Sequence, residues 1–276
     1  MIQPRLGMVA ATVAIVGTLV VTDTAAALPA TRVFAQAPNG GNASTGAHAG
    51  VRATAAAPLP PAVVSKRIIG YSVRGRPIRA YELGERGARK TVVALGSMHG
   101  NEQDGTVLIS QLINGKPITG VHLWVLPRDN PDGYLRNVRH NARGVDLNRN
   151  FPTKWKRATG YYNSGARPSS EPETRVLKRF LDRVNPGHVV TFHSPLRGID
   201  VYGAKDRPFA RRLSTHLRLP TKSFDCSGGC HGTLTQWFNR NHPGACVTVE
   251  FGSDPRPRYL NVRAPRGFLR AIGGSR

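Results

Sequence analysis

The sequence predicts an α/β fold with one sheet that helices cover on both faces. Short apolar runs rich in β-branched residues alternate along the chain with runs whose apolar residues recur at helical spacing. Such alternation is typical of a sheet packed between helices. The segment that carries it, residues 63–276, also has the size of one domain.

Five segments have the composition of buried strands, and two have the apolar spacing of helices. The expected strands are residues 79–83, 91–95, 121–126, 188–192 and 246–251. The expected helices are residues 104–113 and 171–184, the second with Ser169 and Ser170 as N-cap candidates. Polar clusters follow three of the strands, and such sheets bind ligands beyond the carboxyl ends of their strands.

The N-terminus has the pattern of a secretory signal peptide. Arg5 precedes an apolar run over residues 7–21, and the small residues Ala25-Ala26-Ala27 follow it. We expect residues 1–27 to be the signal, with cleavage after Ala27, and the protein to be secreted or held in the cell envelope. Cleavage at Ala35-Gln36-Ala37 and an uncleaved anchor are the alternatives, although the run is short for a span of about 20 residues.

Residues 28–62 are rich in Ala, Gly, Pro, Ser and Thr. Such a composition buries too little apolar surface to offset the entropy of ordering, so we expect a disordered linker. The folded domain should then occupy residues 63–276.

The chain is strongly basic, with 39 Lys and Arg against 16 Asp and Glu and a formal charge of +23. This field favours anionic partners, unless it only reflects an arginine-rich proteome. Export makes nucleic acid an unexpected partner and leaves an anionic cell wall as the natural one. No stable membrane span is expected once the signal is removed.

The three cysteines, Cys226, Cys230 and Cys246, all follow the signal and would meet an oxidising compartment. Cys226 and Cys230 can close a small loop, and a pairing with Cys246 is equally open. One cysteine is left over, and zinc ligation by this set is disfavoured because His231 alone lies nearby.

A histidine and a glutamate three residues apart form the first candidate metal site. His99 and Glu102 lie in a run after an expected strand, where this spacing can place both side chains on one side. Catalytic zinc takes three protein ligands and leaves a fourth position open. His193, at the end of the expected strand 188–192, is the best candidate for the third ligand.

Other motifs carry a resemblance to a known family. They are residues 71–78 (Tyr-Ser-Val-Arg-Gly-Arg-Pro-Ile), 130–134 (Asn-Pro-Asp-Gly-Tyr), 144–152 (Gly-Val-Asp-Leu-Asn-Arg-Asn-Phe-Pro) and Glu250. In this order, together with His99, Glu102 and His193, they resemble the zinc carboxypeptidases of the carboxypeptidase A type. The resemblance covers residues 63–252.

The resemblance implies a three-layer α/β/α sandwich around a mixed, mostly eight-stranded sheet. It implies one zinc ion held by His99, Glu102 and His193, with Glu250 as the general base that activates water. Asn148 and Arg149 match the clamp for the terminal carboxylate of the substrate.

A further residue match is Arg139, which corresponds to the arginine that polarises the scissile carbonyl. Arg136 and Arg143 lie close enough in the sequence to be alternatives. The chemistry agrees with these roles, because an arginine stabilises a developing oxyanion and binds a carboxylate in bidentate fashion.

Residues 139–152, 170–174 and 192–196 look like those of the bacterial murein peptide amidases. Those enzymes cut the γ-D-glutamyl–diaminopimelate bond of cell-wall peptides. Arg197 or Asp200 could meet the diaminopimelate side chain. We therefore expect a metallopeptidase that removes a C-terminal residue from murein peptides. The alternatives are a general metallocarboxypeptidase and a non-catalytic, basic wall-binding protein of the same fold.

The sequence departs from the digestive carboxypeptidases in one respect. They carry a mobile tyrosine upstream of the final glutamate, whereas residues 223–238 contain no tyrosine. Phe224 or Trp237 could cover the site, but neither can donate a phenolic hydroxyl.

Overall fold

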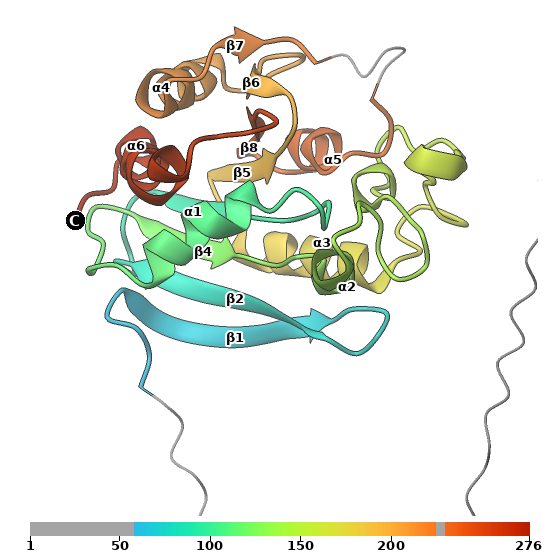
Figure 1. Ribbon diagram of the computed structural model, residues 1–276, viewed down its shortest axis with the longest axis horizontal. Coiled ribbons are helices and arrows are strands. Elements are labelled where there is room, and N and C mark those ends of the chain that lie inside the picture. Colours follow the sequence, from blue (N-terminus) through green and yellow to red (C-terminus); the bar gives the residue numbers. More distant parts are fainter. Residues whose placement is uncertain (1–57, 225–229) are drawn as a thin grey trace, which may run out of the picture. The chain divides into compact units, whose positions relative to one another are not determined.

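The computed structural model describes residues 58–224 and 230–276, which form a mixed eight-stranded sheet between helices (Figure 1). The strand order is β1-β2-β4-β3-β5-β8-β6-β7. The strands are β1 Val63–Tyr71, β2 Pro77–Gly84, β3 Thr91–Leu95, β4 His122–Leu126, β5 His188–His193, β6 Arg197–Asp200, β7 Thr221–Lys222 and β8 Ala245–Phe251. All five strands expected from the sequence are present, and β1, β6 and β7 are additional.

The centre of the sheet is parallel and its margins are mixed. Strands β4, β3, β5 and β8 run parallel to one another. The β1–β2 hairpin adds antiparallel strands at one side, and β6 pairs antiparallel to β8 at the other. The carboxyl ends of the parallel strands therefore meet at one edge, where the polar clusters of the sequence follow them.

The helices are short and lie on both faces of the sheet. They are α1 Asp104–Ile113, α2 Pro131–Arg136, α3 Pro172–Val184, α4 Arg207–Leu217, α5 Leu234–Asn241 and α6 Ala264–Ile272. Helix α1 has the predicted bounds. Helix α3 begins at Pro172 with Glu171 in the N-cap position, so Ser169 and Ser170 do not cap it. Proline is well suited to the first helical position because its missing N–H would have no partner there.

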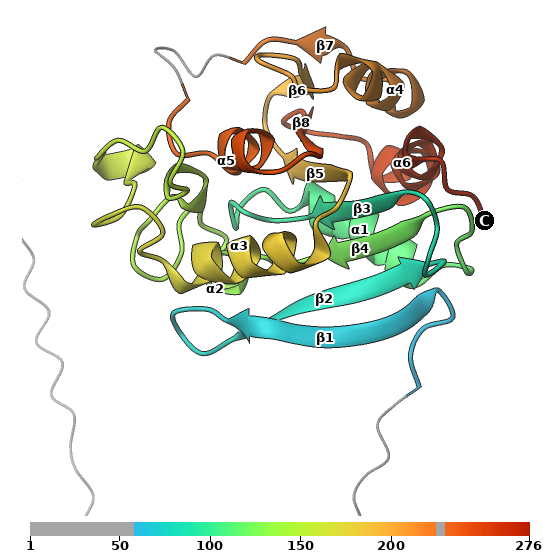
Figure 2. The same ribbon diagram turned by 180° about the vertical axis from the view of Figure 1, so that it is seen from behind.

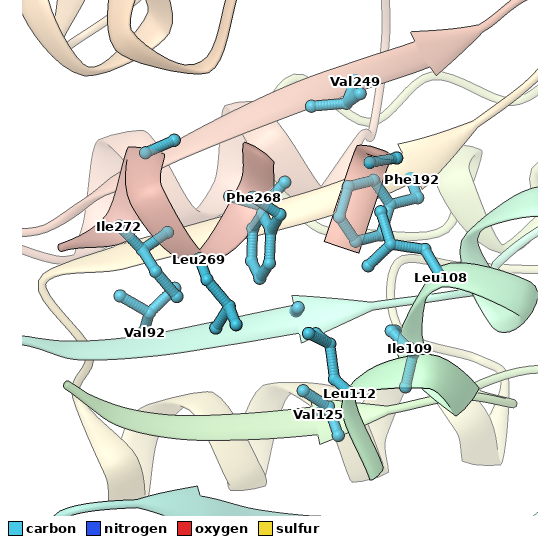
Figure 3. Packing of buried hydrophobic residues seen from close by; sticks show 14 of the residues in the cluster. Val92, Leu108, Ile109, Leu112, Val125, Phe192, Val249, Phe268, Leu269 and Ile272 are labelled. Carbon is cyan, nitrogen blue, oxygen red and sulfur yellow. The ribbon is translucent and has the colours of Figure 1, made fainter. Parts of the chain in front are cut away.

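Two apolar clusters lie on opposite faces of the sheet and define three layers. Helices α1, α4 and α6 pack on one face, and α3 and α5 pack on the other. Figures 1 and 2 view these faces from opposite sides. Figure 3 shows the first cluster, in which Phe192 and Val249 of the sheet meet Leu108 of α1 and Phe268 of α6. The predicted three-layer α/β/α sandwich is confirmed.

Two predictions concern residues that are not described. The signal peptide over residues 1–27 and the linker as far as residue 57 lie outside the described ranges, so both stay predictions. Among residues 58–224 and 230–276, no helix is both long enough and apolar enough to span a bilayer.

The cysteines divide into two kinds. Cys230 is disulfide-bonded, whereas Cys246 is a free thiol buried beneath α5. Pairing of Cys246, one of the two alternatives, is therefore wrong. Cys226 lies outside the described residues. Burial raises the pKa of Cys246 to about 12, so this thiol stays protonated and inert at neutral pH.

Candidate metal centre and active site

One face of three neighbouring strands carries most of the polar side chains near the carboxyl edge of the sheet. Because side chains alternate along a strand, the residues two apart share a face. In β5 and β8 the registers pair His193 with Glu250 and Thr191 with Thr248, and in β6 Gly198 pairs with Glu250. We call this the site face: Thr191, His193, Gly198, Asp200, Thr248 and Glu250. The opposite face of the same strands is apolar and packs on α1 and α6.

His99 and Glu102 come from the turn between β3 and α1. The Glu102 N–H donates to the His99 carbonyl at 3.0 Å, which closes the turn and places both side chains on one side. Gly100 lets this turn lie against the start of α2. A Cβ atom at this position would come within 2.0 Å of the Gly133 carbonyl carbon. The glycine in the His-x-x-Glu run is therefore required by the close approach of two backbones.

The three predicted ligands meet in a buried cluster. His99 Nδ1 lies 2.9 Å from Glu102 Oε1, and His193 Nδ1 lies 2.8 Å from Glu102 Oε2. The two Nδ1 atoms are 3.2 Å apart. One ligand atom from each residue lies within 4.8 Å of the others, and each side chain is almost completely buried. The structure thus brings together two separated parts of the sequence, the turn that holds His99 and Glu102 and the end of β5.

The chemistry of these donors fits a metal cation. His99 Nε2 lies 3.0 Å from Asp146 Oδ1. Because a carboxylate only accepts, Nε2 carries the hydrogen, and in the neutral ring Nδ1 then presents a lone pair to the cluster. Thr191 Oγ1 similarly contacts the outer nitrogen of His193 at 3.1 Å. Such outer partners orient histidines that bind metals, and two histidines with one carboxylate form a catalytic zinc set.

The electrostatics of the cluster favour a positive charge at its centre. Burial opposes ionisation of His99, but Glu102 and Asp146 outweigh it and raise its pKa to about 9. Burial also opposes ionisation of Glu102, yet the two histidines hold the pKa of its carboxyl far below the usual range. A proton or a metal ion can supply this positive charge.

Arg139 stands beside the cluster with one edge fixed. Its Nε and Nη2 atoms donate to Asp146 Oδ2 at 2.9 and 2.8 Å, while Nη1 lies 3.3 Å from Glu102 Oε1. The two alternatives lie elsewhere. Arg136 is exposed and donates to the Asn141 carbonyl, and Arg143 is exposed near Glu171. Arg139 alone of the three lines the cavity described below.

Glu250 is a half-buried residue whose carboxyl has one oxygen without a partner. Its Oε2 atom is enclosed, and no described residue donates a hydrogen bond to it. Burial, reinforced by the neighbouring charge of Glu102, raises the pKa of Glu250 to about 8. Since β5 and β8 pair His193 with Glu250, the carboxyl stands next to a metal-ligand candidate.

All seven predicted site residues line one cavity of about 740 Å³. Asn148 and Arg149 enter it from the short helix Leu147–Arg149, which Asp146 caps through a bond to the Asn148 N–H. The Asn148 Oδ1 atom accepts from the Leu234 N–H at 3.0 Å, which leaves its NH₂ group as the free end.

Two exposed tyrosines at the rim were not anticipated. Tyr161 and Tyr162 line the cavity from the short helix Gly160–Tyr162. The Arg139 guanidinium lies 4.9 Å from the Tyr161 ring, and that of Arg149 lies 5.0 Å from the Tyr162 ring. No local pattern in the sequence places this loop over the arginines, since only the tertiary fold does so.

One sequence interpretation is corrected, and two partners of the histidines were missed. Trp237 cannot cover the site, because it is buried in the core and stacks on Phe151, whereas Phe224 does line the cavity. The partners Asp146 and Thr191 were also missed. A residue two before His193 in a strand shares its face, so the period of the strand could have indicated Thr191.

Comparisons with known proteins agree with this geometry. The sequence pattern of the family described as zinc carboxypeptidase matches residues 54–202. The chain is 33% identical to murein peptide amidase A of Escherichia coli (strain K12) over 198 residues, which cover 66% of this chain and 79% of the relative. It is also 29% identical to the human carboxypeptidase N catalytic chain, over 45% of this chain and 36% of the relative.

Solved structures are similar as well. The murein-tripeptide amidase from Escherichia coli O157 matches with a TM-score of 0.64 and 25% identity, covering 78% of this chain and 93% of that one. Carboxypeptidase A from Helicoverpa armigera matches with a TM-score of 0.64 over 77% of this chain and 69% of that one, and its 19% identity shows the fold alone. The chain belongs to the zinc carboxypeptidase family and is a metallopeptidase of the carboxypeptidase type, related to murein peptide amidase.

Proposed function

We propose that this protein is an exported zinc peptidase that releases the C-terminal residue of murein peptides by cleaving the γ-D-glutamyl–diaminopimelate bond. One observation carries the proposal. A two-histidine, one-carboxylate cluster, a carboxyl with one unpaired oxygen and an arginine beside the cluster line the same cavity. The similarity to murein peptide amidase A supports the choice of substrate.

His99, Glu102 and His193 would hold the zinc ion. When bound, zinc supplies Lewis acidity, which polarises the carbonyl and makes water a stronger acid. A nearby cation also lowers the pKa of Glu250, so its carboxyl is ionised near neutral pH and can accept a proton from water. Glu250 then passes that proton to the leaving amine.

The two arginines have different tasks. Asp146 fixes Arg139 through Nε and Nη2, and Nη1 lies against Glu102 at the edge of the ligand cluster. From this position Nη1 would donate to the scissile carbonyl oxygen as negative charge develops there. Arg149 and the free NH₂ group of Asn148 would bind the terminal carboxylate and thereby place the last peptide bond beside Glu250. The protein thus acts at C-termini.

We further propose that export brings the protein to an anionic cell wall. A basic groove of about 650 Å³ lies away from the active site and is lined by Lys66, Arg76, Arg79 and Arg128. Asp132 pairs with Arg76 at 2.7 Å, whereas no described acidic group lies within salt-bridge distance of the other three. Such a groove favours association with wall polymers.

The test is hydrolysis of a synthetic L-Ala–γ-D-Glu–diaminopimelate tripeptide by the purified full chain. We expect diaminopimelate to be released, activity to be lost with a chelator and regained with zinc, and Glu250→Gln to lower kcat by at least about 100-fold. Glu85→Gln, which alters an exposed carboxylate, is the matched control and should retain full activity.

Two further substrates show which part of the proposal holds. Amidation of the terminal carboxylate should abolish cleavage, because Arg149 then lacks its partner. Release of residues from α-linked peptides but not from the γ-linked tripeptide would replace the murein assignment with a general carboxypeptidase. Cleavage that persists after complete metal removal would contradict the zinc mechanism.

A further inference from the structure

Asp200 is a residue of the site face that the proposed mechanism does not use. In the β6–β8 register Ile199 pairs with Val249, and continuing by one residue places Asp200 opposite Thr248. Asp200 therefore shares its face with Glu250 and lies about 7 Å further along the strand direction. It lines the same cavity as the metal-ligand candidates, whereas Arg197, the other residue suggested for this task, does not.

The Asp200 carboxylate is held in place through one oxygen. Its Oδ1 atom accepts from the Tyr202 N–H at 2.9 Å and the Phe224 N–H at 3.2 Å. In the described parts of the chain, no group donates to Oδ2, and no lysine, arginine or histidine nitrogen lies within 4.0 Å of the carboxylate. Among the described residues, Oδ2 is therefore left without a donor on a side chain that lines the cavity.

Within residues 58–224 and 230–276, this carboxylate is a negative charge with no protein cation in salt-bridge contact. Partial burial raises its pKa above the ordinary value, because the charged form has lost water. The two arginines of the cavity have other partners: Asp146 fixes Arg139, and Arg149 faces the expected position of the substrate carboxylate. An uncompensated carboxylate in a cavity is costly unless a cationic ligand completes it.

The wall next to Asp200 on the site face carries polar side chains, while Pro195, Leu196 and Phe224 line other parts of the cavity. Thr235 and Thr248 line the cavity, and their hydroxyl oxygens lie 3.0 Å apart. A pocket for a large apolar side chain would bury hydrocarbon instead. Arg149 and Asp200 thus offer opposite charges within one cavity, which suits a residue with a carboxylate at its Cα and an ammonium further along its side chain.

We propose that Asp200 is the specificity determinant of the pocket for the released residue and binds the ammonium group at the end of its side chain. The favoured substrates are then peptides that end in a diamino acid, such as diaminopimelate or lysine. This inference rests on the proposed function, because it takes the C-terminal residue to occupy this part of the cavity.

A purely structural role for Asp200 makes a different prediction. The two backbone N–H groups need only an acceptor oxygen, which asparagine also supplies. Asp200→Asn should therefore preserve the fold and remove only the charge. Asp182→Asn, on the exposed surface of α3, is the matched control.

The experiment compares the zinc-loaded full chain with these variants on γ-D-Glu peptides ending in diaminopimelate, lysine or norleucine, which lacks the ammonium. We expect Asp200→Asn to lower kcat/KM about 10- to 100-fold for the first two peptides and less than about 3-fold for the third. Asp182→Asn should change none of them. An equal loss on all three peptides would overturn the inference and leave the proposed function standing.

A binding measurement distinguishes failure of the Asp200 inference from failure of the proposed function. Calorimetric titration with free L-lysine and L-norleucine needs no turnover, so it tests Asp200 even if no peptide is cleaved. We expect the native protein to bind lysine at least about 10-fold more tightly than norleucine, and Asp200→Asn to abolish the difference. Absence of this preference in the native protein would overturn the inference, whereas absence of cleavage with the preference intact would overturn the proposed function alone.

Discussion

At the scale of single residues, the site is a chain of buried opposite charges with one exception. Each charged side chain of the site contacts one of opposite charge within 3.3 Å: Arg139 contacts Asp146, Asp146 contacts His99, and His99 contacts Glu102. Although burial opposes ionisation, His99 and Arg139 hold the pKa of Asp146 far below the ordinary value. Among the described residues, Glu250 has no such partner. Its contribution to the free energy of unfolding therefore depends on pH and on the presence of a metal.

We expect Glu250→Gln to stabilise the metal-free protein increasingly as pH rises above 4.5. Below pH 4.5 the Glu250 carboxyl is protonated in both the folded and the unfolded chain, so it contributes nothing. Between 4.5 and about 8 the unfolded chain releases this proton while the folded chain keeps it, so the free energy of unfolding falls as pH rises. The variant should gain on the order of 2–4 kcal/mol at about pH 9.

Urea unfolding in the presence of a chelator measures this gain, at about pH 5 and about pH 9. Glu85→Gln, which changes an exposed carboxylate, should show no pH-dependent difference. Excess zinc should shrink the gain, because a cation stabilises the ionised carboxyl of the native residue. A gain of equal size at both pH values would show that burial does not raise the pKa of Glu250.

The sequence predicted the residues that carry chemistry better than the residues that support them. The seven predicted site residues lie in one cavity because their types and order resemble those of a family. The resemblance gave no role to Asp146, although it lies in the same motif as Arg149. Tyr161 and Tyr162 were missed because an irregular loop brings them to the rim, and no periodicity marks such a loop.

At the scale of elements, the two faces of strand β5 serve different purposes. Phe192 points into the apolar core beside Phe251 and Phe268, while its neighbour His193 points into the site. The core side of β5 therefore fixes the position of the ligand side. Most of the expected strands were short runs rich in apolar and β-branched residues, whereas residues 79–83 alternate polar and apolar side chains. Strand β1, with exposed residues such as Ile68, and the short β7 carry no such signal.

We expect Gly100→Ala to weaken metal binding by separating the ligand turn from α2. The added Cβ would lie 2.0 Å from the Gly133 carbonyl carbon and 2.3 Å from the Tyr134 nitrogen, and backbone atoms cannot rotate away. The turn must shift, which displaces His99 and Glu102. We expect a loss of about 1–3 kcal/mol in the free energy of unfolding and at least about 10-fold weaker zinc binding.

Gly187→Ala is the control for this experiment. Its Cβ would meet only the Thr91 carbonyl oxygen at 3.7 Å, an ordinary contact. Urea unfolding and competitive zinc titration of both variants measure the two effects. Equal zinc affinity for Gly100→Ala and the native protein would mean that the ligand turn is not held by its contact with α2.

At the scale of the whole molecule, much of the positive charge lies away from the active-site residues. All but three of the 39 Lys and Arg residues, and all but one of the 16 Asp and Glu residues, follow residue 57. The excess positive charge therefore belongs to the segment that contains the folded domain. Much of it, including Lys66, Arg79 and Arg128, lies outside the active-site cavity. Catalysis alone does not require this charge, whereas retention at an anionic surface does.

We expect the full chain, expressed in a bacterium with an anionic wall, to be recovered with the wall and released by salt. Attraction between exposed charges reaches about 14 Å at 0.05 M salt and only about 4 Å at 0.5 M, so raising NaCl over this range should free most of the protein. Fractionation followed by immunoblotting measures both export and retention. Deletion of residues 1–27 should leave the protein in the cytoplasm, which controls for binding during lysis. Recovery of the full chain in the cytoplasm would contradict export, and retention on the wall at 0.5 M NaCl would contradict an electrostatic attachment.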